Sequence, residues 1–173
     1  MTCVVVGLGA CGPEADVFLR KAMTQLAHHP AWRVLHSSRV YRNPAWGAPL
    51  PFDFRNAAML LEAHGSPAGV LRNLLTIENR LGRVRSIRYG KRSLDLDLLW
   101  SEGQPVASDF LTLPHPRLTQ RAFALVPLIE VLDEAQIAVP LEYRRAAAQT
   151  RRQERLFLHS LSLSTDFAGA VEH

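Results

Sequence analysis

The stretch Leu94-Asp95-Leu96-Asp97-Leu98-Leu99-Trp100 alternates leucine with aspartate over its first five residues. Alternation with a period of two predicts a β-strand, because successive side chains of a strand point to opposite faces. The leucines would face a core, and Asp95 and Asp97 would share the other face. Aspartates are poor strand formers, and like charges on one face repel each other. The strand therefore predicts a cationic partner or ligand for its two carboxylates.

A basic stretch precedes this strand and contains five cations within residues 83–92. The Cα atoms of Asp95 and Asp97 would lie about 6.6 Å apart, which is twice the rise of a strand. Their carboxylates could jointly hold a pair of metal ions about 3.5–4 Å apart. Divalent cations and arginines together neutralise the oxygens of a polyphosphate. The segment therefore favours a nucleoside triphosphate site over a solvent-facing strand that carries two ordinary acids.

The order of the predicted elements around this strand indicates the fold class. The elements follow one another as strand 2–9, helix to about residue 28, strands 32–41 and 54–63, helix 66–81 and strand 93–100. This β-α-β-β-α-β order is that of the ferredoxin-like pattern. We therefore expect an α+β fold, a ferredoxin-like α/β/α sandwich with a mostly antiparallel central sheet. We expect residues 1–143 to form a single domain, and residues 144–173 to form a peripheral basic helix and tail.

The composition of the chain indicates its class and its surroundings. Its 173 residues are 47% apolar and 21% charged, with a formal net charge of +4, which is typical of a globular protein. No apolar run approaches the roughly 20 residues needed to span a bilayer. The two cysteines, Cys3 and Cys11, are too few for a disulfide scaffold, and reduced thiols are usual in the cytosol. We therefore expect a cytoplasmic monomer that binds no membrane.

Two further segments carry residues suited to a binding site. In the run Pro114-His115-Pro116 a histidine is held between two prolines, which stiffen its backbone. Arg121 and Phe123 follow shortly after, and Phe54 and Asn56 stand at the start of the predicted strand 54–63. Taken one at a time, these residues are a structural histidine, a surface cation, core aromatics and a turn asparagine. Their combination is what favours a site.

Together, the quoted segments resemble the 6-hydroxymethyl-7,8-dihydropterin pyrophosphokinase family over residues 2–135. The run Arg88-Tyr89-Gly90-Lys91-Arg92-Ser93-Leu94-Asp95-Leu96-Asp97 is similar to its signature, and the run from Pro114 to Phe123 is similar to a second one. Residues 41–47 and 54–57 resemble its pterin-side elements. The resemblance implies an ATP-dependent diphosphotransferase of folate biosynthesis. Such an enzyme transfers pyrophosphate from ATP to the hydroxymethyl group of 6-hydroxymethyl-7,8-dihydropterin and gives AMP.

The resemblance also implies a role for each matching residue. Asp95 and Asp97 would hold two Mg²⁺ ions. The catalytic residues would be Arg83, Arg92, Asp95 and Asp97. The ATP contacts would be Arg85, Arg88, Arg92, Leu98, Thr112, His115 and Arg121. The pterin contacts would be Pro44, Trp46, Phe54, Asn56, Asp95 and Phe123, with the two phenylalanine rings on either side of the flat pterin and Asn56 at its amide edge.

Several positions depart from the family pattern, and they leave two alternatives open. The departures include Gly9-Ala10-Cys11 after the first strand, Asn43-Pro44-Ala45, and Lys91 in place of a proline. The first alternative is a diverged homologue that binds ATP but has lost or changed its pterin reaction. The second is a nucleic-acid-binding ferredoxin-like module, which would need a ladder of exposed aromatic residues to stack bases. The sequence has no such ladder, so we expect no nucleic-acid partner.

Overall fold

The computed structural model describes residues 1–44, 52–82 and 94–160. Its central sheet is antiparallel in every pairing and has the order β5-β1-β4-β3-β8, with β2 also paired to β4. The strands of this sheet are β1 (Thr2–Ala10), β2 (Trp32–Ser37), β3 (Tyr41–Asn43), β4 (Phe54–Ala63), β5 (Leu94–Ser101) and β8 (Phe157–Leu158). A separate small hairpin consists of β6 (Val106–Ala107) and β7 (Thr112–Leu113).

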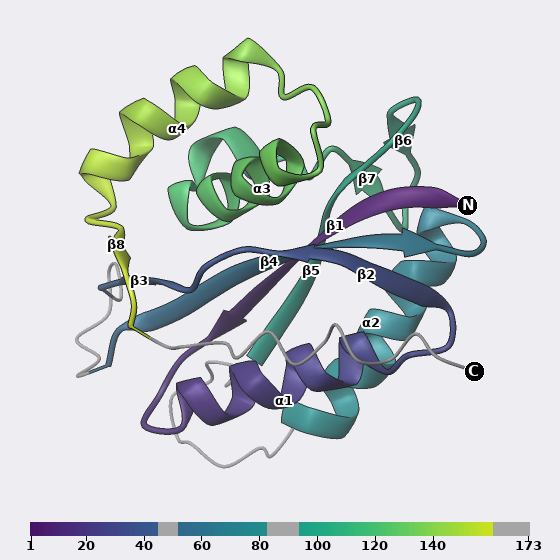
Figure 1. The fold of residues 1–173 in the computed structure, drawn as a ribbon, viewed down its shortest axis with the longest axis horizontal. Helices are drawn as coiled ribbons and strands as arrows, with labels where there is room; N and C mark the ends of the chain where they lie inside the picture. The colour runs from purple at the N-terminus through teal and green to yellow at the C-terminus, as the bar shows by residue number, and fades with distance from the viewer. Residues whose placement is uncertain (45–51, 83–93, 161–173) are drawn as a thin grey trace.

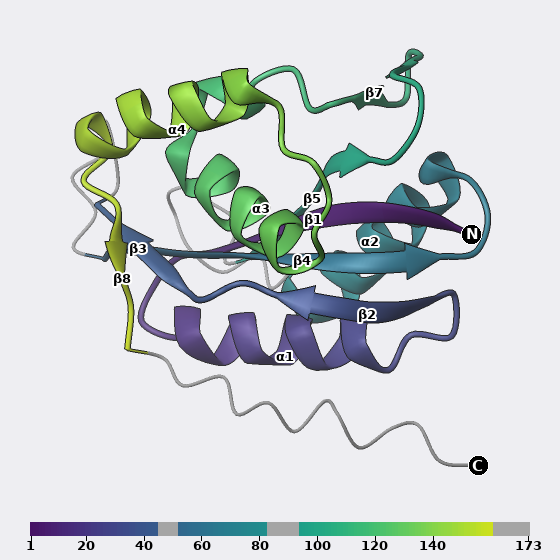
Figure 2. The same cartoon turned by 45° about the horizontal axis from the view of Figure 1, so that its top comes forward.

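Helices cover both faces of the sheet. Figures 1 and 2 show α1 and α2 against one face, and α3 and α4 on the other. The helices are α1 (Ala15–Ala27), α2 (Pro67–Gly82), α3 (Ala122–Glu134) and α4 (Leu141–Gln153), and a short 3₁₀ helix, η1 (Leu118–Gln120), precedes α3. The expected ferredoxin-like α/β/α sandwich with an antiparallel sheet is confirmed. No helix among the described residues has the length and hydrophobicity to cross a membrane.

The alternation on β5 divides the core into two parts. Leu94, Leu96 and Leu98 are buried beneath α1 and α2, where they meet side chains such as Leu19 and Leu74. Leu99 faces the other side and packs with residues of α3 and α4. A β-bulge makes this possible, because Val5 pairs with Trp100 while Val6 pairs with Leu98, so that Leu99 is the extra residue of β5.

The predicted continuous strand 32–41 is wrong, because it is divided into β2 and β3 at residues 38–40. Ser38 interrupts the ladder. Its backbone N–H donates to the carbonyl of Ala58 (2.9 Å), and its hydroxyl oxygen accepts from the N–H of the same residue (2.8 Å). The break allows β2 and β3 to lie along different parts of β4.

The C-terminal segment returns from α4 to the edge of the sheet. Helix α4 packs on α3 through buried Tyr143 and Ala147. Arg155 then takes a left-handed backbone conformation (φ 49°), and the side chain of Leu156 is buried against Tyr41 and Ala122. Strand β8 pairs with β3 beyond this point, so the described part of the segment is anchored at the same end of the sheet as Phe54 and Asn56 (Figure 1).

Candidate active site

Two glycines of β1 form the floor of the site. The strand register places Gly9 between Asp95 and Asn56, and Gly7 between Asp97 and Ala58. Paired residues of antiparallel strands point to the same face, so the two carboxylates and Asn56 stand on either side of a strand that contributes no side chain there. A Cβ on Gly9 would lie 3.5 Å from Asn56 Oδ1. Gly9 therefore leaves open space above the sheet, whereas a Cβ on Gly7 would lie 2.8 Å from Leu99 Cδ1, so Gly7 makes room for the Leu99 side chain.

This space is a cavity of about 490 Å³, which is within the range of small-molecule sites. Its walls come from β1, β4 and β5, from the start of α3, and from the end of α4. Six of the residues predicted from the sequence line it, namely Phe54, Asn56, Asp95, Asp97, Arg121 and Phe123. One cavity therefore combines aromatic rings, an amide, two carboxylates and a guanidinium group.

The other predicted site residues are placed differently. Pro44, Thr112 and His115 are described but do not line the cavity, and the side chain of Leu98 is buried in the core on the opposite face of the sheet. Only the backbone of Leu98 could therefore reach a ligand. Trp46, Arg83, Arg85, Arg88 and Arg92 lie outside the described residues.

The amide of Asn56 is oriented by a second asparagine. Asn56 is 5% exposed, and its Nδ2 donates to Asn43 Oδ1 at 2.6 Å. Asn43 in turn donates from its Nδ2 to the carbonyl of Pro44 (3.2 Å). Because Nδ2 of Asn56 is engaged in this way, its Oδ1 is turned toward Gly9 and the cavity as a hydrogen-bond acceptor. The sequence gives no signal for this role of Asn43, since the contact depends on the pairing of β3 with β4.

The start of α3 carries Arg121 and Phe123 into the cavity. Arg121 is the N-cap residue, and its side chain makes no capping hydrogen bond to the start of the helix. Its guanidinium group lies 5.7 Å from the centre of the Phe123 ring, a distance at which a cation and an aromatic face attract each other. The N–H of Phe123 donates to Glu154 Oε2 at 3.0 Å. Glu154, at the end of α4, thus supplies the acceptor that the helix start lacks.

Sequence reasoning missed Gln153 and Glu154, which both line the cavity. They belong to the segment 144–173 that was expected to be peripheral. No motif marks them, because Glu154 reaches Phe123 across 31 positions of the chain. The division of the chain at residue 143 stays a prediction.

His115 lies half-buried between β7 and η1. Its backbone N–H donates to the carbonyl of Leu99 (2.8 Å), and its Nδ1 accepts from the N–H of Arg117 (3.1 Å). An accepting Nδ1 leaves Nε2 as the protonated nitrogen of the neutral ring. Burial lowers the pKa of His115 below its ordinary value of 6.5; Asp97 opposes this effect, whereas Arg121 and Arg117 add to it. His115 is therefore a neutral hydrogen-bond donor at pH 7, within the electrostatic reach of Asp97 and Arg121.

The chemistry of the carboxylates suits a magnesium ion. Among the residues that the structure describes, no group of three or more His, Cys, Asp or Glu side chains could enclose a metal. Mg²⁺ does not need such a cage, because it usually binds one or two carboxylates together with water and substrate phosphates. Asp95 is half-buried and Asp97 is exposed, and both line the cavity. They fit an ion that enters together with a nucleotide.

Comparisons with known proteins show the family of the chain. The family model for 7,8-dihydro-6-hydroxymethylpterin-pyrophosphokinase (HPPK) matches residues 5–133. A 2-amino-4-hydroxy-6-hydroxymethyldihydropteridine pyrophosphokinase of Methylorubrum extorquens is 40% identical over 137 residues, which are 79% of this chain and 87% of that protein. Its namesake in Bacillus subtilis is 32% identical over 76% of this chain and 78% of the relative.

Solved structures show the same fold. A structure of an HPPK-DHPS in complex with substrates superposes with a TM-score of 0.65 at 11% identity, over 88% of this chain and 44% of the other. The HPPK-DHPS of Plasmodium falciparum gives a TM-score of 0.59 at 12% identity, over 90% of this chain and 45% of the other. The chain therefore spans less than half the length of these fused proteins.

The fold and the relatives define an enzyme of the diphosphotransferase class, built on a ferredoxin-like sheet. The chain belongs to the 7,8-dihydro-6-hydroxymethylpterin-pyrophosphokinase family. The names of its relatives support pyrophosphokinase activity in folate biosynthesis, and the alternative of a nucleic-acid-binding module is not favoured. Enzymes of this family use ATP with magnesium.

Proposed function

We propose that the cavity binds 6-hydroxymethyl-7,8-dihydropterin beside the triphosphate of ATP and transfers pyrophosphate between them. One observation carries the proposal: Phe54, Asn56 and Phe123 share a single cavity with Asp95 and Asp97. Flat rings and an oriented amide suit a planar heterocycle, and paired carboxylates suit the metal that accompanies phosphates. The two groups of residues thus suit the two substrates.

On the pterin side, the rings of Phe54 and Phe123 would enclose the heterocycle. Asn56 Oδ1 would accept a hydrogen bond from an N–H of its amide edge, because Asn43 already engages Nδ2. Pro44 and Trp46 would complete this side of the site. The pterin's hydroxymethyl group would then point toward Asp95.

On the phosphate side, Asp95 and Asp97 would hold two Mg²⁺ ions. When bound, these ions neutralise the phosphate charge and orient the triphosphate. His115 Nε2–H and the guanidinium group of Arg121 would donate to phosphate oxygens. The remaining nucleotide contacts would come from Arg83, Arg85, Arg88, Arg92, Leu98 and Thr112, with Leu98 acting through its backbone.

In the reaction, the hydroxymethyl oxygen attacks the β-phosphorus of ATP. A bond forms between these two atoms, the bond from the β-phosphorus to the α–β bridging oxygen breaks, and AMP leaves with that oxygen. The hydroxyl proton passes to water. The residues of the site would act by holding both substrates in line and by neutralising charge on the phosphates, which are the main sources of rate in phosphoryl transfer.

The test is conversion of ATP to AMP by the purified chain with and without 6-hydroxymethyl-7,8-dihydropterin. We expect AMP only when both substrates and Mg²⁺ are present, together with a product heavier than the pterin by one diphosphate group in the mass spectrum. AMP formation that does not depend on the pterin would contradict the proposal. A panel of other hydroxymethyl heterocycles then tests whether the substrate has changed.

We further propose that the chain acts as a cytoplasmic monomer without nucleic acid. Its own cavity holds residues for both substrates, so the proposed reaction needs no residue from a second copy. Light scattering gives the mass in solution, and the ratio of absorbance at 260 and 280 nm shows whether nucleic acid copurifies. A dimer mass, or bound nucleic acid that survives purification, would refute the corresponding part.

A further inference from the structure

The C-terminal segment lies beyond the region that matches the family, yet it contributes to the site. The matching region ends at residue 133, yet Gln153 and Glu154 line the cavity. Glu154 is the more deeply engaged of the two, because it is half-buried and its carboxylate accepts from the N–H of Phe123 at 3.0 Å. A part of the chain outside the matched region therefore touches a backbone group that carries a predicted pterin contact.

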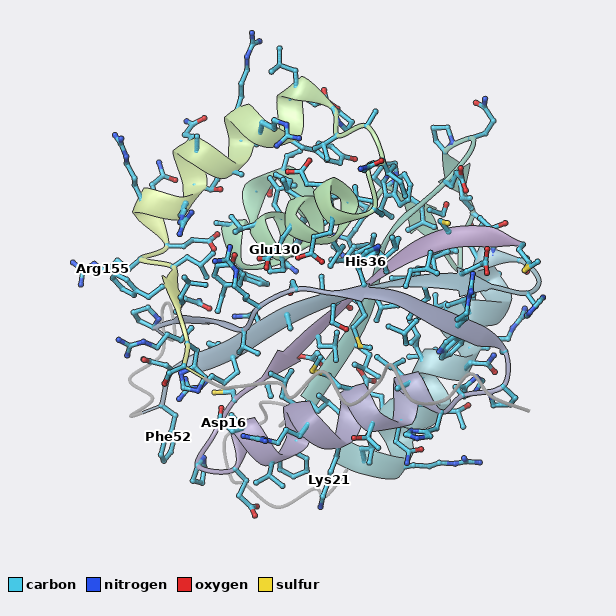
Figure 3. The ribbon with its side chains drawn as sticks, viewed as in Figure 1. Asp16, Lys21, His36, Phe52, Glu130 and Arg155 are labelled. Carbon is cyan, nitrogen blue, oxygen red and sulfur yellow. The ribbon has the colours of Figure 1, made fainter. Side chains whose placement is uncertain are left out.

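Several independent contacts hold Glu154 in place. Its backbone N–H donates to the carbonyl of Thr150 at 2.9 Å, so the residue closes the last turn of α4. The next residue, Arg155, reverses the chain with φ 49°, and its side chain points away from the molecule in Figure 3. Leu156 is then 4% exposed against Tyr41 and Ala122. Glu154 therefore lies between the end of α4 and the buried Leu156, and both restrict the position of its carboxylate.

The start of α3 needs such a carboxylate. The first N–H groups of a helix have no partner within the helix and together carry a partial positive charge. Arg121, the N-cap residue, has no side-chain cap bond. Burial raises the pKa of Glu154, and the N–H groups of Phe123 and Ala122 and the charge of Arg121 work against that rise. The backbone of α3 and the Arg121 side chain therefore offset part of the effect of burying the acid.

We propose that Glu154 is a positioning residue of this enzyme, which fixes the start of α3 so that Phe123 presents its ring to the pterin. The inference rests on the proposed function, because it concerns the residue assigned to the pterin wall. Glu154 acts through the N–H of Phe123 and takes no part in the bonds that form or break. The 141–160 segment thereby completes the pterin side of the cavity.

The experiment compares three variants of the full chain. Glu154→Met keeps the length of the side chain but removes both acceptor oxygens. Glu154→Gln keeps an amide oxygen that accepts from Phe123 while removing the charge. Glu142→Met is the matched control, since Glu142 is an exposed acid in the first turn of the same helix. Initial rates of AMP formation are measured with each substrate varied separately, and amide exchange at Phe123 is followed by NMR.

We expect Glu154→Met to raise the KM for the pterin about fivefold, the factor that loss of one helix cap commonly produces in an equilibrium. The KM for ATP should change less, and Glu154→Gln and Glu142→Met should both stay near the parent. Exchange at the Phe123 amide should accelerate only in Glu154→Met. An unchanged pterin KM in Glu154→Met, or a Glu154→Gln variant as impaired as Glu154→Met, would overturn the proposal.

The two readouts separate this inference from the function on which it rests. If the parent forms no AMP with the pterin, the proposed function fails, whatever the variants do. If the parent is active and Phe123 exchange responds to Glu154→Met while the pterin KM does not, the contact is only structural, and the positioning role is rejected.

Discussion

Leu96 and Asp97 are neighbours on β5, yet their side chains enter opposite faces of the sheet, and the two faces differ in kind. On the face of Leu96, side chains of the sheet, α1 and α2 form a closed apolar core. On the face of Asp97, the core under α3 and α4 ends where Gly7 and Gly9 contribute no side chain, and a cavity follows. The closed face stabilises the fold, and the open face holds the polar groups that a ligand needs.

This difference shows how one strand pattern serves two purposes. Alternation directs every second residue to the same face, so the residues of the two faces can differ independently along the same strand. A substitution on one face should therefore affect stability, and its neighbour on the other face should affect catalysis. Substitutions on each face test that separation.

Asp97→Ala should reduce turnover on the order of 10²–10³-fold, the usual effect of losing one electrostatic element of a phosphate-handling site. Its stability should change little or rise slightly, because the substitution relieves repulsion between Asp97 and Asp95 on one strand face. Steady-state AMP formation at saturating Mg²⁺ measures the rate, and thermal melts measure stability. The control is Asp109→Ala, which removes an exposed acid away from the cavity. Turnover of Asp97→Ala within about threefold of the parent would return Asp97 to the status of an ordinary surface acid.

Leu96→Ala should produce the opposite result at the adjacent position. Leu96 is 2% exposed within the closed core, and truncating a buried leucine lowers the free energy of unfolding by about 2–5 kcal/mol. Turnover per folded molecule should stay close to that of the parent. Urea unfolding measures the first quantity and AMP formation at low temperature the second. Leu75→Ala, at a position 39% exposed on α2, is the control. Loss of turnover in a folded Leu96→Ala protein would mean that the two faces are not separable.

Gly9→Ala tests whether the open face must remain empty. The new Cβ would lie 3.5 Å from Asn56 Oδ1, an ordinary contact distance, so the fold should accept it. The methyl group would occupy space above the sheet beside the acceptor proposed for the pterin. The KM for the pterin should rise about tenfold, as expected for one methyl group placed in a fitted pocket, while the melting temperature stays near that of the parent. Gly69→Ala, on α2, is the control. If Gly9→Ala kept the pterin KM of the parent, the pterin would have to bind away from Gly9.

How far these features can be predicted from the sequence differs between the two faces. Alternation of Leu and Asp is a local signal, and it correctly predicts both the strand and the shared side of Asp95 and Asp97. No local signal marks Gly7 and Gly9 as the floor of the site, because this role depends on the register in which β1 pairs with β4 and β5. The residues of the closed face can therefore be predicted from hydrophobic periodicity. Those of the open face come together only through the pairing of β1 with β4 and β5.

Polar contacts between segments that are far apart in the chain cannot be predicted from local sequence patterns either. Glu130 has the pattern of an ordinary acid on the surface of a helix. In the structure it lies between α3 and the sheet (Figure 3), where it accepts from Tyr41 Oη at 2.5 Å and from Arg39 Nε at 2.8 Å. Burial and this carboxylate raise the pKa of Tyr41 to about 12. No motif could have indicated the contact, because Tyr41 and Glu130 are 89 positions apart.

The smallest expected effect concerns the pH dependence of stability, and it tests the protonation of His115 beside the open face. Burial lowers the pKa of His115, beside the open face, below its ordinary value of 6.5. As pH falls, the unfolded chain takes up this proton before the folded chain does. The stability that a neutral His115 contributes is therefore present above pH 6.5 and is lost as pH falls through the lower pKa of the folded state.

His115→Gln removes this titration while keeping a polar side chain at the position. The free energy of unfolding of the parent should therefore decrease more between pH 7.5 and 5 than that of His115→Gln, whereas His64→Gln, at an exposed position, should follow the parent. Urea unfolding of all three proteins over this pH range gives the comparison, with the parent's other titrating groups cancelling in the difference. If His115→Gln lost as much stability as the parent, protonation of His115 would not be penalised in the folded state. The folded chain would then take up the proton as readily as the unfolded chain, and below pH 6.5 His115 would be a charged imidazolium, which binds phosphate by charge as well as by its hydrogen bond.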